Sequence, residues 1–265
     1  MRRRTSLALA LIPLLALAPG CDDEPTKTPA KSASLASPAP PPPPTVTAPP
    51  APTTAPEPPR KRREGPCPKD ANVSFPDSTL EGAVRVQLQK REGPIARSEL
   101  GKVKTLNLAS APTDDELDPC IFPLFTGVKG LYLAPGKLDD LTPLKTLTTI
   151  ESLRISVTRV KDLSPLAGLV KLDRLDAGRT PITDLAPLAS CVNLTELQID
   201  ETEVSDLAPL AKLKKLEMIS IKRTKVSDVS PLKELTKLKH IYIEGSLVKD
   251  ISAIQGIPGI KIHQG

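Results

Sequence analysis

A period of 22 residues runs through the C-terminal half of the chain. Six aspartates recur at this interval: Asp140, Asp162, Asp184, Asp206, Asp228 and Asp250. Five of them are followed three residues later by a proline: Pro143, Pro165, Pro187, Pro209 and Pro231. The stretches between them share the pattern L-x-x-L-x-L-x-x-(T/S)-x-(V/I), where x is any residue. A fixed period of this kind predicts stacked units, none of which buries its apolar face alone.

The physics of one unit follows from the alternation of its side chains. Leu197 and Ile199 are expected to point inward from a short strand, while Glu196, Gln198 and Asp200 point outward. Strands of successive units must pair in parallel because each turn of the coil runs the same way. The repeating aspartate stands where it can cap a short helical turn, and the proline falls within the first turn, where its missing N–H does little harm.

These repeats resemble the leucine-rich repeats of internalin-like proteins, and the resemblance covers about residues 72–265. It implies an α/β solenoid with a parallel β-sheet on the concave face and short helical turns on the convex face. The family usually has asparagine where this chain has a hydroxyl residue, so a continuous asparagine ladder is absent. Those hydroxyl residues, which could bond a neighbouring turn, are Thr158, Thr180, Thr202, Thr224 and Ser246.

The segment FPDSTLEGAVRVQL resembles the N-terminal helical cap of the same family. Ser78 and Glu81 are spaced as a capping box. An apolar stripe of four residues follows, made of Leu80, Ala83, Val84 and Leu88. We expect the cap over residues 67–102, the first strand at Val103 to Leu108, and repeats over 103–265. The last repeat should end in an abbreviated strand from Ile257 to Ile262.

Residues 1–20 have the pattern of an export signal. Three arginines precede an apolar segment from Leu7 to Ala18, which is too short to cross a bilayer as a helix. The sequence LAPGC resembles a bacterial lipobox, which implies lipid attachment at Cys21; cleavage after the small residues Ala16 and Ala18 is the alternative. Residues 21–66 are rich in proline, alanine, threonine and serine, which predicts a disordered tether.

Composition excludes several classes of function. The chain has 36 Lys and Arg against 31 Asp and Glu, but the excess lies before the repeats, so the repeat region lacks the basic footprint of a nucleic-acid binder. Aromatic residues make up only 2% of the chain, too few for base-stacking platforms. With two histidines, we expect no metal site, no cofactor and no histidine-based catalytic triad.

The four cysteines differ in their expected roles. Cys191 occupies a position that other repeats fill with leucine, so it should be a core residue. Cys67 lies just before the cap and Cys120 lies in the long first repeat. In an exported protein these two could form a disulfide that ties the cap to the repeats, or they could remain free thiols.

Equivalent strand positions form rows across the predicted sheet, and these rows are the default binding surface of a solenoid. The candidate binding residues are Tyr132, Arg154, Arg174, Asp176, Glu196, Gln198, Met218, His240 and Tyr242. The competing interpretation is that lateral pairs such as Arg154 with Asp176 only keep the sheet soluble.

The pattern as a whole favours a non-catalytic, membrane-tethered recognition or adhesion module on an exported bacterial lipoprotein of the cell envelope. Its partner would be another protein, with a glycan or wall polymer as the second choice. The alternative is a structural or regulatory subunit of an envelope complex that assembles through the C-terminal repeat edge. An enzyme is the third class, with His240 and Glu196 as the nearest acid–base candidates.

Overall fold

The 22-residue period is the repeat of a coiled solenoid, as predicted. In the computed structural model, which describes residues 66–109 and 116–265, eight strands form one parallel sheet in strict sequence order. The signal peptide, the proposed lipid site at Cys21 and residues 21–65 of the tether lie outside the described residues. The strands are β3 (Thr105–Asn107), β4 (Gly130–Tyr132), β5 (Ser152–Arg154), β6 (Arg174–Asp176), β7 (Glu196–Gln198), β8 (Met218–Ser220), β9 (His240–Tyr242) and β10 (Lys261–His263).

Strand pairing keeps each repeat in register with the next. Leu153 pairs with Leu175 and Leu175 with Leu197, so one apolar position forms a continuous column inside the coil. The members of this column from β3 to β9 are at most 2% exposed: Leu106, Leu131, Leu153, Leu175, Leu197, Ile219 and Ile241. Because each repeat contacts only the repeats next to it, stacking supplies the core that a single repeat lacks.

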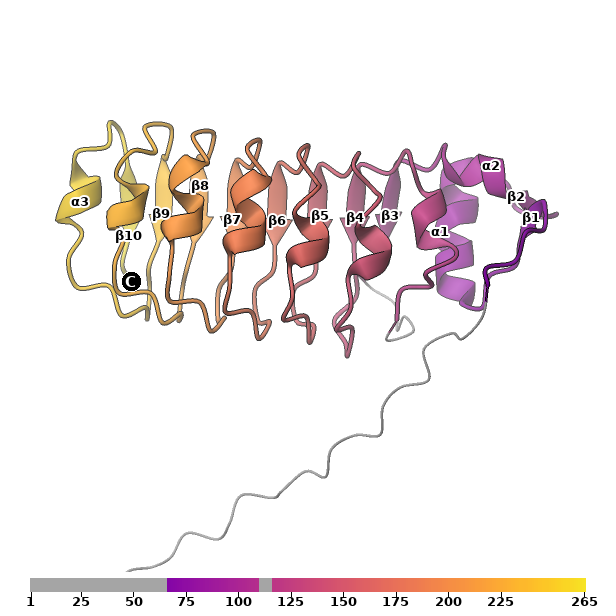
Figure 1. Ribbon diagram of the computed structural model, residues 1–265, viewed down its shortest axis with the longest axis horizontal. Helices are drawn as coiled ribbons and strands as arrows, with labels where there is room; N and C mark the ends of the chain where they lie inside the picture. Colours follow the sequence, from indigo (N-terminus) through magenta and orange to yellow (C-terminus); the bar gives the residue numbers. More distant parts are fainter. Residues whose placement is uncertain (1–65, 110–115) are drawn as a thin grey trace, which may run out of the picture. The chain divides into compact units, whose positions relative to one another are not determined.

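Short helical turns cover the side opposite the sheet (Figure 1). They are η1 (Phe122–Leu124), η2 (Thr142–Leu144), η3 (Ser164–Leu166), η4 (Ala186–Ser190), η5 (Ala208–Lys212), η6 (Ser230–Leu232) and α3 (Ser252–Gln255). Before each turn from η2 onward, the repeating aspartate accepts a hydrogen bond from the backbone N–H two residues later, at 2.7–2.8 Å. The proline lies at the first or second position of the turn. The proline has its predicted role in η2 to η6, whereas the aspartate lies one residue before the N-cap position and satisfies the first N–H of each turn.

The repeating hydroxyl residues close their own loops and do not bridge to a neighbouring repeat. The hydroxyl of Thr202 donates to the carbonyl of Ile199 at 2.7 Å, and Thr158, Thr180, Thr224 and Ser246 do the same. Each follows a residue with left-handed backbone. One hydroxyl thus satisfies a carbonyl of the loop just after the strand.

The N-terminal cap forms as predicted, but with a different capping residue. Helix α1 (Ser78–Leu88) begins after Asp77, whose carboxylate accepts a hydrogen bond from the N–H of Thr79 at 2.7 Å. The prediction of a capping box from Ser78 and Glu81 is therefore wrong. Asp77 has the extended backbone of an N-cap residue, whereas Ser78 is already helical. The Glu81 carboxylate pairs with Arg85 at 2.6 Å, one helical turn further on.

The rest of the cap connects α1 to the sheet. Strand β1 (Asn72–Val73) pairs antiparallel with β2 (Ile95–Ala96), and α2 (Arg97–Leu100) follows. The predicted apolar stripe is correct, since Leu80 and Val84 are buried and Ala83 and Leu88 pack against the core. The first strand, β3, is shorter than the predicted segment from Val103 to Leu108.

Cysteines lie at three positions in the described residues. Cys67 and Cys120 form a disulfide with their Cα atoms 5.3 Å apart, which joins the segment before the cap to the first repeat. Cys191 is fully buried, and burial raises the pKa of its thiol. A protonated, inaccessible thiol is a core residue and not a nucleophile.

The C-terminal end differs from the predicted strand at Ile257 to Ile262. Strand β10 begins at Lys261. Before it, Ile254 of α3 and Ile257, two residues after α3, lie in the core at 0% and 4% exposure. Ile260 and Ile262 are partly buried. The isoleucines from Ile257 to Ile262 therefore do not form an exposed apolar group at this edge.

Candidate interaction surface

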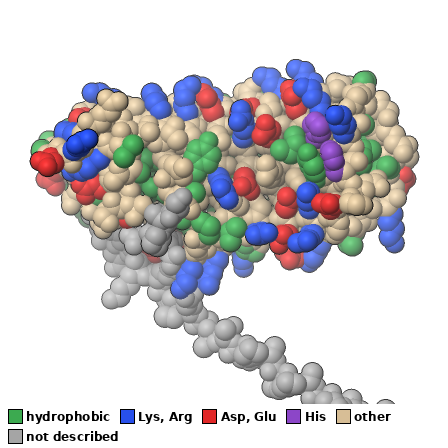
Figure 2. Space-filling view, turned by 180° about the vertical axis from the view of Figure 1, so that it is seen from behind, with side chains coloured by type: hydrophobic (Ala, Val, Ile, Leu, Met, Phe, Trp, Pro, Cys, Tyr) green, Lys and Arg blue, Asp and Glu red, His purple; other side chains and the backbone are tan. Residues whose placement is uncertain are grey.

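The sheet brings all nine candidate side chains to one side of the repeat domain, which we call the strand face (Figure 2). The register aligns Tyr132, Arg154, Asp176, Gln198 and Tyr242 in one row, continued by His263. A second row holds Arg174, Glu196, Met218 and His240. All nine are at least partly exposed. Along the sheet, the ion-paired candidates lie on β5 to β7, whereas most of the rings lie on β9 and β10.

Ion pairs occupy the middle of the strand face. Arg154 Nε lies 3.3 Å from an Asp176 carboxylate oxygen, and Arg174 Nε lies 3.9 Å from one of Glu196. Arg174 also lies 3.4 Å from the carboxylate of Asp173. Exposed pairs of this kind contribute about 0–1 kcal/mol each to stability. These four candidates thus pair with one another, as the competing interpretation expects.

A second polar group lies beside the aromatic end of the face. The Asp200 carboxylate accepts hydrogen bonds from the Ser220 hydroxyl at 2.6 Å and from the Lys222 backbone N–H at 2.8 Å. The ammonium of Lys222 lies 2.9 Å from Glu244. A hydrogen bond from Lys222 lowers the pKa of Glu244, and the same bond raises the pKa of Lys222. Both groups are therefore held in their charged forms.

Three rings gather on strands β9 and β10, and we call His240, Tyr242 and His263 the ring cluster. Tyr242 stacks on His263 with centroids 4.2 Å apart and planes 11° from parallel. His240 Nδ1 lies 3.3 Å from His263 Nε2. Lys222 Nζ lies 5.0 Å from the Tyr242 ring centre, within the range of a cation–π contact. Met218 pairs in register with His240, so an apolar side chain adjoins the rings on the next strand.

His263 is the functional candidate that sequence reasoning missed. The predicted last strand stopped at Ile262, so the row through Tyr242 was not extended by one repeat. The signal was present, because Ile262 aligns with Ile241 and thereby places His263 beside Tyr242. The departure from the 22-residue spacing in the last repeat conceals that alignment.

Tyr132 lies on β4, apart from the ring cluster. Its hydroxyl donates to the Ser152 hydroxyl oxygen at 3.3 Å. Its ring lies against Gly130 of the same strand, where a Cβ atom would come within 3.2 Å of the ring. Glycine at this position lets the tyrosine lie along the sheet.

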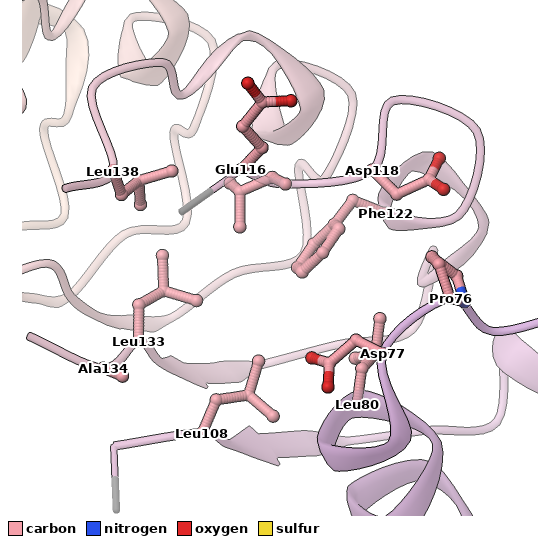
Figure 3. Close-up of a pocket in the computed structure, with 11 residues that line it drawn as sticks. Pro76, Asp77, Leu80, Leu108, Glu116, Asp118, Phe122, Leu133, Ala134 and Leu138 are labelled. Atoms are coloured by element: carbon pink, nitrogen blue, oxygen red, sulfur yellow. The ribbon is translucent and has the colours of Figure 1, made fainter. Parts of the chain in front are cut away.

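A cavity between the cap and the first repeats is too small for an organic ligand (Figure 3). Its volume is about 40 Å³, whereas pockets for drug-sized ligands measure about 300–1,000 Å³. Figure 3 shows Leu80 of α1, Leu108 after β3 and Leu133 after β4 at its wall. It is a packing gap between the cap and the coil.

Over 66–109 and 116–265, no three His, Cys, Asp or Glu side chains form a group that could hold a metal ion. Within the same ranges, no helix is both long and apolar enough to cross a membrane.

The parallel sheet, helical turns and cap define a leucine-rich repeat solenoid of the internalin type. Internalin C2 of Listeria monocytogenes is similar in structure, with a TM-score of 0.60 and 27% sequence identity over 72% of this chain and 94% of that one. An internalin (inlF) of the same species has a TM-score of 0.59 and 24% identity, over 72% of this chain and 63% of that one. No protein-family model matches this sequence, and no curated protein is significantly similar to it.

Proposed function

We propose that this protein is a non-catalytic interaction module that binds another protein through the strand face. The observation that carries the proposal is the ring cluster together with Met218, half-buried side chains that meet on three adjacent strands and face outward. Binding energy in protein interfaces concentrates in a few central, well-packed residues, among which tyrosine is enriched. The internalin-like fold supports an interaction role, although fold by itself does not determine function.

The ion pairs supply a polar rim to this surface. Arg154 with Asp176 and Arg174 with Glu196 lie on the strands preceding the ring cluster. A rim of exposed charges contributes more to orientation and association rate than to affinity. A protein with an apolar or aromatic anchor and flanking charges of both signs is the expected partner, and a glycan or wall polymer is the second choice.

The geometry offers little support for catalysis. His240, the nearest acid–base candidate, contacts His263, while Glu196 lies two strands away and pairs with Arg174. A general acid or base must lie within hydrogen-bond reach of the group it serves. We therefore assign no reaction, cofactor or nucleic-acid partner to the chain.

Export and lipid anchoring belong to the same proposal. The signal pattern of residues 1–20, the lipobox ending at Cys21 and the proline-rich tether over 21–66 would hold the cap (67–102) and the repeats (103–265) away from a bacterial membrane. The disulfide between Cys67 and Cys120 suits an oxidising compartment, which supports export. Cys21→Ser should shift the protein from the membrane to the soluble fraction, and an unchanged distribution would count against the anchor.

An alternative assembly role is favoured by one observation at the C-terminal end. Strand β10 is the last in the sheet and pairs only with β9 among the described residues. An unpaired strand edge can template another chain. In this alternative the protein is a structural or regulatory subunit of an envelope complex.

Photo-crosslinking in native envelopes distinguishes the two surfaces. A photoreactive residue at Gln198 on the strand face should trap a discrete protein. The same residue at Lys233, which follows the helical turn η6, should not. Crosslinking only from Gln264, beside the β10 edge, would favour the assembly role, and none from either surface would contradict a protein partner.

A further inference from the structure

The two histidines of the chain meet at a single place on the surface. They are 23 residues apart in the sequence, yet parallel pairing of β9 with β10 brings His240 Nδ1 to 3.3 Å from His263 Nε2. Both side chains are only partly buried, so the pair is open to solvent and to ions. The purple side chains in Figure 2 lie side by side near one end of the strand face.

The spacing of the two nitrogens suits a shared metal ion. A zinc–nitrogen bond measures about 2.0–2.1 Å, and two such bonds at a tetrahedral angle place the nitrogens roughly 3.3–3.4 Å apart. The observed separation is 3.3 Å. The ring centroids are 5.6 Å apart, so the rings meet edge to edge with these nitrogens facing each other. Modest rotation of each ring would direct both lone pairs at one point.

We propose that His240 and His263 form a two-histidine site for a borderline transition-metal ion, with Zn²⁺ as the reference ion. Neutral imidazole is a common ligand of Zn²⁺, Cu²⁺ and Ni²⁺, whereas Mg²⁺ and Ca²⁺ prefer oxygen ligands. The site does not depend on the proposed protein partner.

The surroundings hold the pair in position. Tyr242 stacks on His263 at 4.2 Å and limits the motion of that ring. Between the two strands, the column residue Ile241 is fully buried and pairs with Ile262, which fixes the backbone register. When this pair binds a metal, it therefore loses less side-chain freedom than two freely moving histidines would lose.

The environment also limits the affinity. The described residues supply two ligands at this place, since they contain no group of three. Water would complete the coordination sphere, as in sites that keep open positions. The nearby carboxylate of Glu244 is paired with Lys222, and Lys261 adds a positive charge on β10. We expect weaker binding than at a site with three or four protein ligands.

Proton NMR gives a direct test, because the full-length chain contains only these two imidazoles. On titration with Zn²⁺, the ring signals of both histidines should shift or broaden together, with one ion bound per pair. His263→Gln should lower the affinity sensed by His240 at least tenfold, and His240→Gln should do the same for His263. Glu196→Gln, two strands away on the same face, should leave the titration unchanged.

Two results would overturn the metal site. The imidazole signals could remain unchanged at millimolar Zn²⁺, which would leave the pair as a hydrogen bond alone. Alternatively, His240 could respond equally with and without His263, which would mean that it binds by itself. Circular dichroism of each variant checks that the repeats are intact, so that loss of binding is not loss of fold. Because the readout is the imidazole itself, zinc bound elsewhere on the protein does not affect the conclusion.

Discussion

In the loop after each of several strands, one residue has a left-handed backbone conformation, which costs free energy. Val157, Arg179, Glu201 and Arg223 all have φ between 53° and 61°, and Gly245 occupies the corresponding place in the next repeat. For residues other than glycine, the left-handed region costs roughly 1–2 kcal/mol, and a β-branched side chain is least suited to it. The sequence period identified these positions as equivalent, but only the backbone showed that they are strained.

Val157→Gly should raise the free energy of unfolding by about 1 kcal/mol. This is the backbone strain that glycine relieves minus the entropy that glycine loses on folding. The valine side chain is 39% exposed, so little packing is lost. Urea denaturation measures the change. Val170→Gly is the matched control, because Val170 is 47% exposed and has no positive φ. The control should lose stability. An equal loss in Val157→Gly would contradict the claim that the left-handed backbone at Val157 is strained.

The capping aspartates should make the fold sensitive to acid. Hydrogen bonds from the backbone N–H and then the hydroxyl of Ser230 lower the pKa of Asp228 from its ordinary 3.8, and Ser252 acts on Asp250 in the same order. A carboxyl whose pKa is lowered by folding stabilises the folded state above the unfolded pKa. That stabilisation is lost as the pH falls through the folded value.

Asp228→Asn should reduce this sensitivity, since the amide oxygen can still accept the backbone hydrogen bond but carries no charge. The difference in urea midpoint between pH 7 and pH 3 should be smaller in the variant than in the parent protein. Identical differences would show that Asp228 does not contribute to acid denaturation.

At the scale of elements, the repeats and the presence of a helical cap were predictable, whereas the exact residues that begin the cap helix and form the last strand were not. Each inner repeat buries the same positions against the same neighbours, so the apolar column from Leu106 to Ile241 could be identified from spacing alone. The cap has no repeated partner to fix its start, and two adjacent residues, Asp77 and Ser78, were both suitable N-caps. At β10, the altered spacing of the last repeat concealed His263.

The disulfide should contribute strongly to holding the cap. It joins cysteines 53 residues apart. Closing a loop of that length stabilises a fold by about 2–4 kcal/mol in typical cases. A double variant, Cys67→Ser with Cys120→Ser, should lose that amount of folding free energy. Relative to the parent protein, its amide hydrogen exchange should accelerate more in α1 than in β6.

The parent protein in reductant should match that double variant. If it does, the loss comes from the disulfide and not from the serine side chains. Unchanged amide exchange in α1 would mean that packing against the first repeat is sufficient to hold the cap.

At the scale of the whole repeat domain, the strand face divides into an ion-paired middle and an aromatic C-terminal end. The sequence predicted which residues share a row, because the strand period and the repeat period fix their places. It also predicted the lateral pair of Arg154 with Asp176, which the structure contains. It could not predict how rings stack across strands, since that depends on side-chain conformations. Arg154 and Asp176 were identified as candidates equal to Tyr242, yet the structure pairs the first two with each other and stacks Tyr242 on His263.

The most direct test is the affinity for the protein crosslinked to position 198. Tyr242→Ala with His263→Ala should weaken binding at least tenfold, because these rings are the proposed anchors. Arg154→Ala with Arg174→Ala should weaken it far less, since charges at the rim contribute more to orientation and association rate than to affinity. Ile262→Pro, which blocks strand addition at the open edge of β10, should leave affinity unchanged. Loss of binding in the β10 variant, with full binding in the ring variant, would contradict the account and assign the partner to the sheet edge.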